Sequence, residues 1–228
     1  MKSKFGLLLL FLSLLSMSRI DAQAPMDPSL PEAPLPHRRV LLFFPGYETI
    51  QDPDIPVARL RTSQKFEMAY RKTVDPSFLI ESAMFAGYYQ VANYGPKYGS
   101  GWGPYAQRFG YNAASISSTF FFTDGLLPTI FHQDPRYFRK GRGSAASRIW
   151  WALRSEGVAY SDAGKQMPNY STLLGFGMST ALNNAYSPPS SITFANTMER
   201  YGVKIGFSFG LNLLREFGGE TKREHNQP

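Results

Sequence analysis

From residue 61 to residue 217 the chain consists of mostly apolar segments, separated by short breaks at proline, glycine and charged residues. Segments of this length and apolar content predict α-helices. We therefore expect an all-α fold, a bundle of about five helices with apolar faces rich in small residues. The sequence shows no internal repeat. The predicted helices cover residues 62–71, 76–92, 105–131, 147–156, 168–186 and 192–217.

Local signals support several of these boundaries. Asp75 followed by Pro76 predicts a helix start, because aspartate caps the first turn and proline needs no hydrogen-bond acceptor there. Ser187-Pro188-Pro189 predicts a helix end, and Pro128 predicts a kink or break in the segment 105–131. The aromatic and glycine-rich stretch 93–104 predicts a loop.

The last segment fits two structures. Residues 201–213 alternate between apolar and polar or glycine positions, which is the period of a strand in an outer-membrane barrel. A helix also fits, with one side formed by Met198, Tyr201, Ile205, Phe209 and Leu213. No other segment alternates as cleanly, and a single strand cannot form a barrel. We therefore favour the helix.

Charged residues are unevenly distributed along the chain. None occurs between residues 166 and 198, and Asp124 is alone between 109 and 131. Gly175 and Ser179, and three glycines at 202, 206 and 210, are spaced for close helix packing, which is common in lipid-embedded bundles and in tight soluble ones. We therefore expect either membrane association or a dense soluble bundle, although two asparagines at 183 and 184 argue against a simple membrane-spanning helix.

The N-terminus predicts export. Lys2 and Lys4 precede a 13-residue apolar stretch that is too short to span a bilayer, and a polar segment ends at Ala22. Residues 1–22 therefore form a predicted signal peptide, with a buried N-terminal helix as the alternative. A proline-rich extended segment (23–60) precedes the helical domain (61–217), and a polar tail (218–228) follows it. Val40–Phe44 within that segment predicts either a strand or a segment inserted into a groove. The predicted location is the periplasm or an envelope membrane, beyond the inner membrane.

Composition excludes several function classes. The chain has no cysteine and only three histidines, which rules out a disulfide scaffold, a thiol nucleophile and a cysteine-ligated metal. We expect neither a bound metal nor a cofactor. The net charge is +7, but the basic residues are locally clustered and export separates the chain from the genome, so nucleic acid is not an expected partner.

The most distinctive string runs from His132 to Gly143. His132 and Asp134 are candidate catalytic residues, because a carboxylate can orient an imidazole that acts as a general base. The basic residues of this region predict contact with a phosphate or an anionic lipid headgroup: Arg136, Arg139, Lys140, Arg142 and Arg148. The alternatives are structural: Asp134 capping a helical turn, His132 bonded to a carbonyl, and a solvated or membrane-orienting basic loop.

Two further carboxylates stand alone in apolar segments. Glu81 and Asp124 are candidates for buried functional groups, or for ion pairs with Arg108 or Arg148. Sequence motifs of serine hydrolases, phosphate-binding loops and zinc helices do not occur.

Several short motifs together resemble an uncharacterised family of exported bacterial proteins that is common in acidobacteria. They cover most of the chain from Ser63 to Phe217: Gln64-Lys65-Phe66, Asp75-Pro76, Tyr98-Gly99, Arg108-Phe109-Gly110, His132-Gln133-Asp134-Pro135-Arg136-Tyr137-Phe138, Asn169-Tyr170-Ser171 and Arg215-Glu216-Phe217. The resemblance implies a helical exported protein and carries over no catalytic residue.

These features predict an exported cell-envelope protein that is associated with a membrane and has a structural or headgroup-contacting role. The alternative is a periplasmic hydrolase that uses His132 and Asp134. The residues alone indicate no specific reaction.

Overall fold

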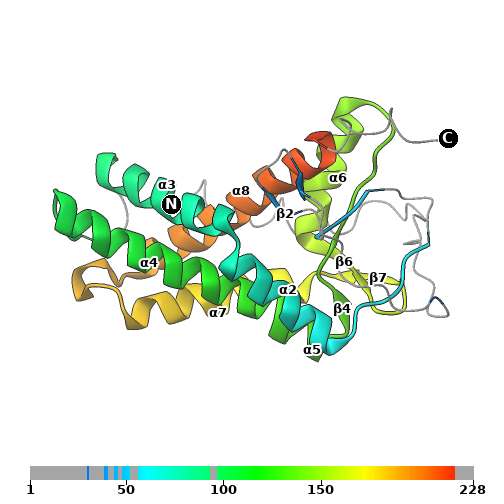
Figure 1. Ribbon diagram of the computed structural model, residues 1–228, viewed down its shortest axis with the longest axis horizontal. Helices are drawn as coiled ribbons and strands as arrows, with labels where there is room; N and C mark the ends of the chain where they lie inside the picture. Colours follow the sequence, from blue (N-terminus) through cyan, green and yellow to red (C-terminus); the bar gives the residue numbers. More distant parts are fainter. Residues whose placement is uncertain are drawn as a thin grey trace.

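The computed structural model describes residues 30, 39–40, 44–45, 48–51, 56–92 and 97–218 (Figure 1). The predicted signal peptide lies outside the described residues. The same is true of most of the proline-rich segment and of the polar tail after residue 218.

The described part of the chain contains six helices of 13 residues or more, which confirms the all-α prediction. The bounds are α2 Thr62–Val74, α3 Pro76–Val91, α4 Trp102–Phe120, α6 Ala145–Gly157, α7 Tyr170–Ala185 and α8 Phe194–Gly218. Asp75 caps α3 as its sequence predicts, accepting a hydrogen bond from the Ser77 amide at 2.9 Å. Because α8 is one continuous helix, the strand alternative for residues 201–213 is wrong.

Four of these helices form the elongated part of the molecule. α4 lies between α3 and α7, and α8 packs against α7 before it reaches α6 at the other end (Figure 1). α2 packs along the C-terminal continuation of α4. The last helix therefore connects the four-helix part to the end that carries α6 and the short strands.

Very short strands gather at that end. β4 (Gln133–Asp134), β6 (Val158–Ser161) and β7 (Gln166–Pro168) form an antiparallel sheet in the order β4-β6-β7. β3 (Thr49–Ile50) pairs in parallel with β5 (Tyr137–Phe138), with Thr49 opposite Tyr137. β1 (Arg39–Val40) and β2 (Phe44–Pro45) form an antiparallel pair with Val40 opposite Phe44, so the two ends of the segment predicted as one strand belong to two different strands. These pairings position the string that begins at His132.

The segment 105–131 changes its helical geometry before Pro128. α4 continues into a π-helix, η1 (Phe121–Leu126), and then into the short α5 (Leu127–Ile130). Proline has no amide hydrogen, and in an α-helix its ring would collide with the carbonyl four residues earlier, at Asp124. The wider turn of the π-helix accommodates Pro128 without ending the helix, so the predicted break is replaced by a π-helix.

α7 and α8 turn mostly polar side chains inward and apolar side chains outward. The inward stripe of α7 consists of Ser171, Gly175, Ser179 and Asn183, all buried. The outward stripe consists of exposed residues at the same four-residue spacing: Tyr170, Leu174, Met178, Leu182 and Tyr186. α3 likewise exposes Ile80, Met84 and Tyr88. None of the described helices has the combined length and hydropathy needed to cross a bilayer.

One small residue of α7 permits a close helix contact. A Cβ atom on Gly175 would lie 2.7 Å from Cγ2 of Thr123 and 3.2 Å from its backbone nitrogen, so α7 and η1 touch at this glycine. The three glycines of α8 have no such neighbour: a Cβ at Gly202, Gly206 or Gly210 meets no described atom within 4 Å. The predicted close packing therefore occurs at Gly175 and is absent along the glycines of α8.

Substituting Gly175 tests this contact. We expect Gly175→Ala to destabilise the protein by about 1–3 kcal/mol, because the added methyl group meets backbone that cannot move aside. Gly177→Ala is the matched control on the same helix, since its Cβ would reach only a ring carbon of Tyr201 at 3.9 Å. The control should be neutral or stabilising by up to about 1 kcal/mol from helix propensity. Urea denaturation measures both, and equal stabilisation by the two alanines would contradict the assignment.

Candidate functional site

A cavity of about 190 Å³ lies among the helices and has a strongly charged lining. Its walls come from α2, α3, α4, η1, α6, α7 and α8, together with residue 48 and the strands β4, β5 and β6. The charged residues that line it are Glu48, Lys72, Glu81, Asp124, Asp134, Arg136, Arg154, Glu156, Arg200, Lys204 and Arg215. A cavity that collects this many ionisable side chains is the strongest candidate for a functional site.

The best-paired charges form a cluster around Lys72. Its Nζ lies 2.9 Å from Oε2 of Glu48 and 3.0 Å from Oδ2 of Asp124, and Arg215 forms a second ion pair with Glu48. The ammonium also lies 4.4 Å from the ring centre of Phe120. Burial alone would raise the pKa of Glu48, but Arg215 and Lys72 together lower it. This cluster joins residue 48, α2, η1 and α8 by internal ion pairs.

Lys204 has a different environment. Its Nζ donates to the hydroxyl oxygens of Thr119 at 2.7 Å, Ser115 at 2.9 Å and Ser179 at 3.2 Å. These three acceptors are neutral, so burial lowers the pKa of Lys204 to about 7, with Glu81 opposing part of that shift. The ammonium therefore titrates near neutral pH while holding α4, α7 and α8 together.

Two carboxylic acids of the cavity also titrate near neutrality. Burial raises the pKa of Glu81 to about 7, against the attraction of Lys72. Burial raises the pKa of Glu156 to about 7 as well, although Ser208 and Asn212 donate to it at 3.1 and 2.7 Å. The cavity thus holds one amine and two carboxylic acids whose pKa values are each about 7.

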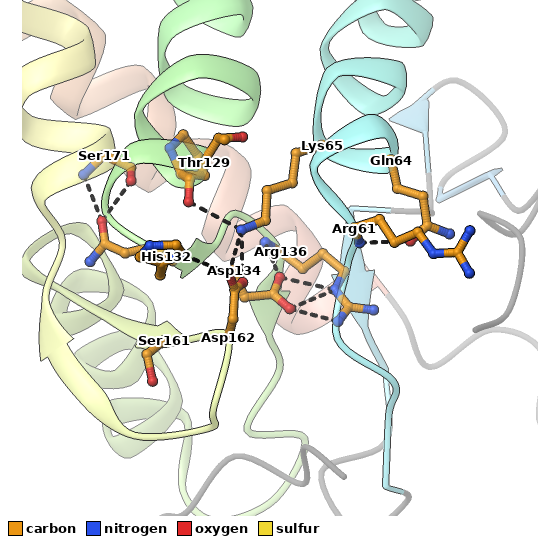
Figure 2. A network of polar contacts seen from close by, with 12 residues as sticks. Arg61, Gln64, Lys65, Thr129, His132, Asp134, Arg136, Ser161, Asp162 and Ser171 are labelled. Atoms are coloured by element: carbon orange, nitrogen blue, oxygen red, sulfur yellow. Dashed lines mark hydrogen bonds and ion pairs between the residues drawn. The ribbon is translucent and has the colours of Figure 1, made fainter. Parts of the chain in front are cut away.

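The structure does not bring the two predicted catalytic residues together (Figure 2). His132 is 85% exposed, lies outside the cavity lining, and has Asp162 as its nearest acidic partner at 4.0 Å. Asp134 is buried and binds Arg136, with 2.6 Å between Oδ2 and Nη2. His132 adopts a left-handed conformation (φ 51°) two residues after the end of α5, and its carbonyl accepts from the Asp162 amide. Both residues therefore have structural partners.

Lys65 explains the position of Asp162 beside His132. Its buried ammonium lies 2.7 Å from Oδ1 of Asp162 and donates to the Pro128 carbonyl at 3.1 Å (Figure 2). The turn after β6 is thus connected to α2 and α5. Asp134 accepts from the Arg136 amide at 2.9 Å, which is a tight turn between two strands rather than a helix cap.

The predicted anion-binding region surrounds an anion that belongs to the chain. The Glu216 carboxylate is fully buried and accepts from Arg148 Nε at 3.0 Å and from the amides of Lys140 and Gly141 at 2.9 Å. Tyr137 donates its hydroxyl to the same carboxylate at 2.8 Å. Basic side chains and free amides in this string do bind a carboxylate, and it is supplied by α8.

We call the five residues Arg136, Arg139, Lys140, Arg142 and Arg148 the basic run. Its members other than Arg148 occupy varied positions. Arg139 donates through Nε to the Glu216 carbonyl at 2.8 Å, and Lys140 contacts the Ser147 hydroxyl. Arg136 pairs with Asp134, and Arg142 is exposed in the turn before α6. The structure thus brings Arg139, Lys140 and Arg148 together around the end of α8.

Four of the charged residues that line the cavity were candidates from the sequence, namely Glu81, Asp124, Asp134 and Arg136, and the others were not. Glu81 and Asp124 both line the cavity, but the partner of Asp124 is Lys72 rather than Arg108 or Arg148. Arg108 instead donates to the Gly99 carbonyl at 2.8 Å. One signal for the missed residues is a polar stripe on α8 at four-residue spacing: Arg200, Lys204, Ser208, Asn212 and Glu216.

No protein-family model matches the chain, and neither a curated protein nor a solved structure does. The resemblance to exported bacterial proteins therefore stays a prediction. Within the described residues, no group of three or more histidine, aspartate or glutamate side chains is arranged to hold a metal ion.

Replacing Glu216 tests the internal anion site. Glu216→Gln places an amide donor against amides and a guanidinium that also donate, and leaves Arg148 without its counter-charge. We expect a loss of about 3–5 kcal/mol in unfolding free energy. Glu199→Gln, at an exposed position of the same helix, should change stability by less than about 0.5 kcal/mol. Comparable small losses in both variants, measured by denaturant titration, would refute the structural role of Glu216.

Replacing Glu81 tests the titration of the cavity. Burial raises its pKa to about 7, so between about pH 4.5 and 7 the folded protein holds a proton that the unfolded chain has lost. Unfolding free energy therefore falls as pH rises through this window. Glu81→Gln should remove the part of that fall that is due to Glu81 and leave the part due to Glu156, whose pKa is also about 7. The variant should therefore be more stable than the native chain by about 3 kcal/mol at pH 8 but not at pH 4.

Glu67→Gln provides the control, because Glu67 is exposed and pairs with Arg71 on the surface of α2. Its pH profile should follow that of the native chain. A Glu81→Gln profile parallel to the native one at every pH would show that Glu81 does not hold its proton in the folded state.

Proposed function

We propose that this chain is an exported cell-envelope protein that associates with a membrane through the outward faces of α3 and α7 and has a structural role there. Export is inferred from the sequence of residues 1–22. The observation that carries membrane association is the stripe of exposed apolar side chains on each of these helices, which in α7 lies opposite a buried stripe of polar and small residues.

The outward faces of α3 and α7 lack ionised groups. α7 contains no charged residue, and Glu81, the only charge in α3, lines the cavity. Met84 is 69% exposed and Val91 is 91% exposed, while Met178 and Leu182 are each more than 40% exposed. Water solvates such stripes poorly, and large exposed apolar patches mark membrane or partner contacts. Contact with lipid hydrocarbon accounts for two apolar stripes on helices that flank α4 from opposite sides (Figure 1).

The basic run supplies less of this association than its sequence suggests. Arg136 faces Asp134, and Arg148 faces Glu216. Their charges are directed at internal carboxylates, which reduces the attraction left for phosphate headgroups. Association through apolar faces should then persist at high salt, whereas headgroup contact is screened.

Vesicle flotation of the full chain tests the proposal. The protein should float with neutral phosphatidylcholine vesicles, and 0.5 M salt should leave the bound fraction unchanged. The double variant Met84→Gln/Met178→Gln removes one apolar side chain from each stripe, each worth roughly 1 kcal/mol when partly buried in lipid. We expect its partition coefficient to fall at least tenfold.

Tyr70→Gln is the matched control, since Tyr70 is 67% exposed on α2, a helix whose surface also carries charged residues. Its partitioning should equal that of the native chain. Failure of the native chain to float with any vesicle would overturn the proposal. If the protein floated only with anionic vesicles and salt abolished this, the basic run and not the apolar stripes would make the membrane contact.

A further inference from the structure

Two cations of the cavity lack a carboxylate partner. Arg200 and Lys204 lie one turn apart on α8, and both line the cavity. Lys204 donates to three hydroxyls, and Arg200 donates to the Asn184 side-chain oxygen at 2.5 Å and, at 3.4 Å, to two further neutral oxygens. Within the described residues neither cation has a carboxylate within ion-pair distance, unlike Lys72 and Arg215. Buried cations are normally paired, so this end of the cavity carries a surplus of positive charge.

Two buried donors at the same end have no hydrogen-bond partner. They are Nε of Arg200 and the hydroxyl of Tyr111, and these residues are 7% and 5% exposed. Tyr111 lines the cavity one helical turn before Ser115, which receives the Lys204 ammonium. Two cations and a phenol thus share one region, and an unpaired buried donor destabilises the protein unless an acceptor reaches it.

Aromatic rings form the adjoining wall. Phe85 of α3 meets Phe207 of α8 edge to face at 5.0 Å and Tyr89 at 5.9 Å, and all three line the cavity. Phe207 lies one turn after Lys204. The site therefore joins a cationic, donor-rich end to an apolar wall.

The geometry points to a binding site for a small organic carboxylate. Its carboxylate is held by Lys204, Arg200 and the Tyr111 hydroxyl, and its apolar body of about six to eight carbon atoms lies against Phe85, Tyr89 and Phe207. This ligand supplies the acceptor that the unpartnered donors need and the counter-charge that the two cations need. The inference is independent of membrane association.

Volume and charge select this class of ligand over others. A cavity of about 190 Å³ exceeds the roughly 150 Å³ that accepts benzene, but it is far too small for a lipid with two acyl chains. Glu81 lines the same cavity, and its carboxyl group would repel a dianion such as a phosphate monoester more than a monoanion. A cationic ligand of the same shape would be repelled by the positive charges of Arg200 and Lys204.

Calorimetric titration of the full chain, without vesicles, tests the site with hexanoate as the probe. Hexanoate should bind. Hexylammonium, which has the same body and the opposite charge, should not bind, and hexan-1-ol and acetate should each bind at least tenfold more weakly. Equal affinity for hexanol and hexanoate, tighter binding of inorganic phosphate, or no heat from hexanoate up to about 10 mM would each overturn the assignment.

Two variants locate the carboxylate. Lys204→Met removes the charge at similar length and should weaken hexanoate binding at least tenfold. Tyr111→Phe removes only a hydroxyl that has no partner in the structure, so it should fold normally and weaken binding about threefold to tenfold. Tyr201→Phe, whose hydroxyl donates to the Leu173 carbonyl outside the cavity lining, should bind like the native chain. Native affinity in both Lys204→Met and Tyr111→Phe would place the ligand elsewhere.

The pH dependence of hexanoate affinity gives a second readout. Between pH 6 and 8 Lys204 loses its proton and Glu81 gains its charge, since the pKa of each group is about 7. Affinity should fall about tenfold or more over this range. The other charged groups that line the cavity from neighbouring elements include Glu48, Lys72, Asp124, Glu156, Arg200 and Arg215. Glu81→Gln should reduce the pH dependence, and an affinity that is constant with pH would contradict the role of Lys204.

Discussion

The arrangement of the helices depends on hydrogen bonds among inward-facing polar side chains of α4, α7 and α8. Ser179 lies 2.9 Å from the hydroxyls of both Ser118 and Thr119, and Asn183 donates to Ser115 at 2.8 Å. The Lys204 ammonium joins the same group from α8. A buried polar group is costly unless it is satisfied, so these contacts permit few alternative registers. The cavity lies where these helices meet α3, and its chemistry follows from this polar interior.

Local sequence signals predicted the helices well and their orientation poorly. The Asp75-Pro76 cap and the helix over 168–186 follow from local rules, and the structure contains both. A polar stripe and an apolar stripe have the same period on a helix, so periodicity does not indicate which one is buried. In α7 the polar stripe is inside. Strands of two residues leave almost no pattern, and the partner of Asp124 is 52 positions away, so neither follows from local sequence.

The string that begins at His132 shows that local sequence identifies chemistry more reliably than partners. Clustered basic residues in this string predict contact with an external anion, and in the structure Arg148 and the Gly141 amide bind the carboxylate of Glu216. Arg148 and Glu216 are 68 positions apart, so only the folded chain reveals the pairing. The contrast with Arg200 and Lys204 is informative, because those cations are also enclosed by helices yet face neutral oxygens.

An apolar exterior and a polar interior are mutually consistent in the proposed membrane setting. Among lipid chains, helices gain little by burying apolar faces, because hydrocarbon surrounds those faces already. Hydrogen bonds and close contacts between small residues must then position the helices, as the Ser179 contacts and the approach of Gly175 to Thr123 do here. The same inward polarity leaves one amine, Lys204, and two acids, Glu81 and Glu156, in the cavity with pKa values of about 7. The outward apolar stripes and the titratable cavity are therefore two consequences of one orientation of the helices.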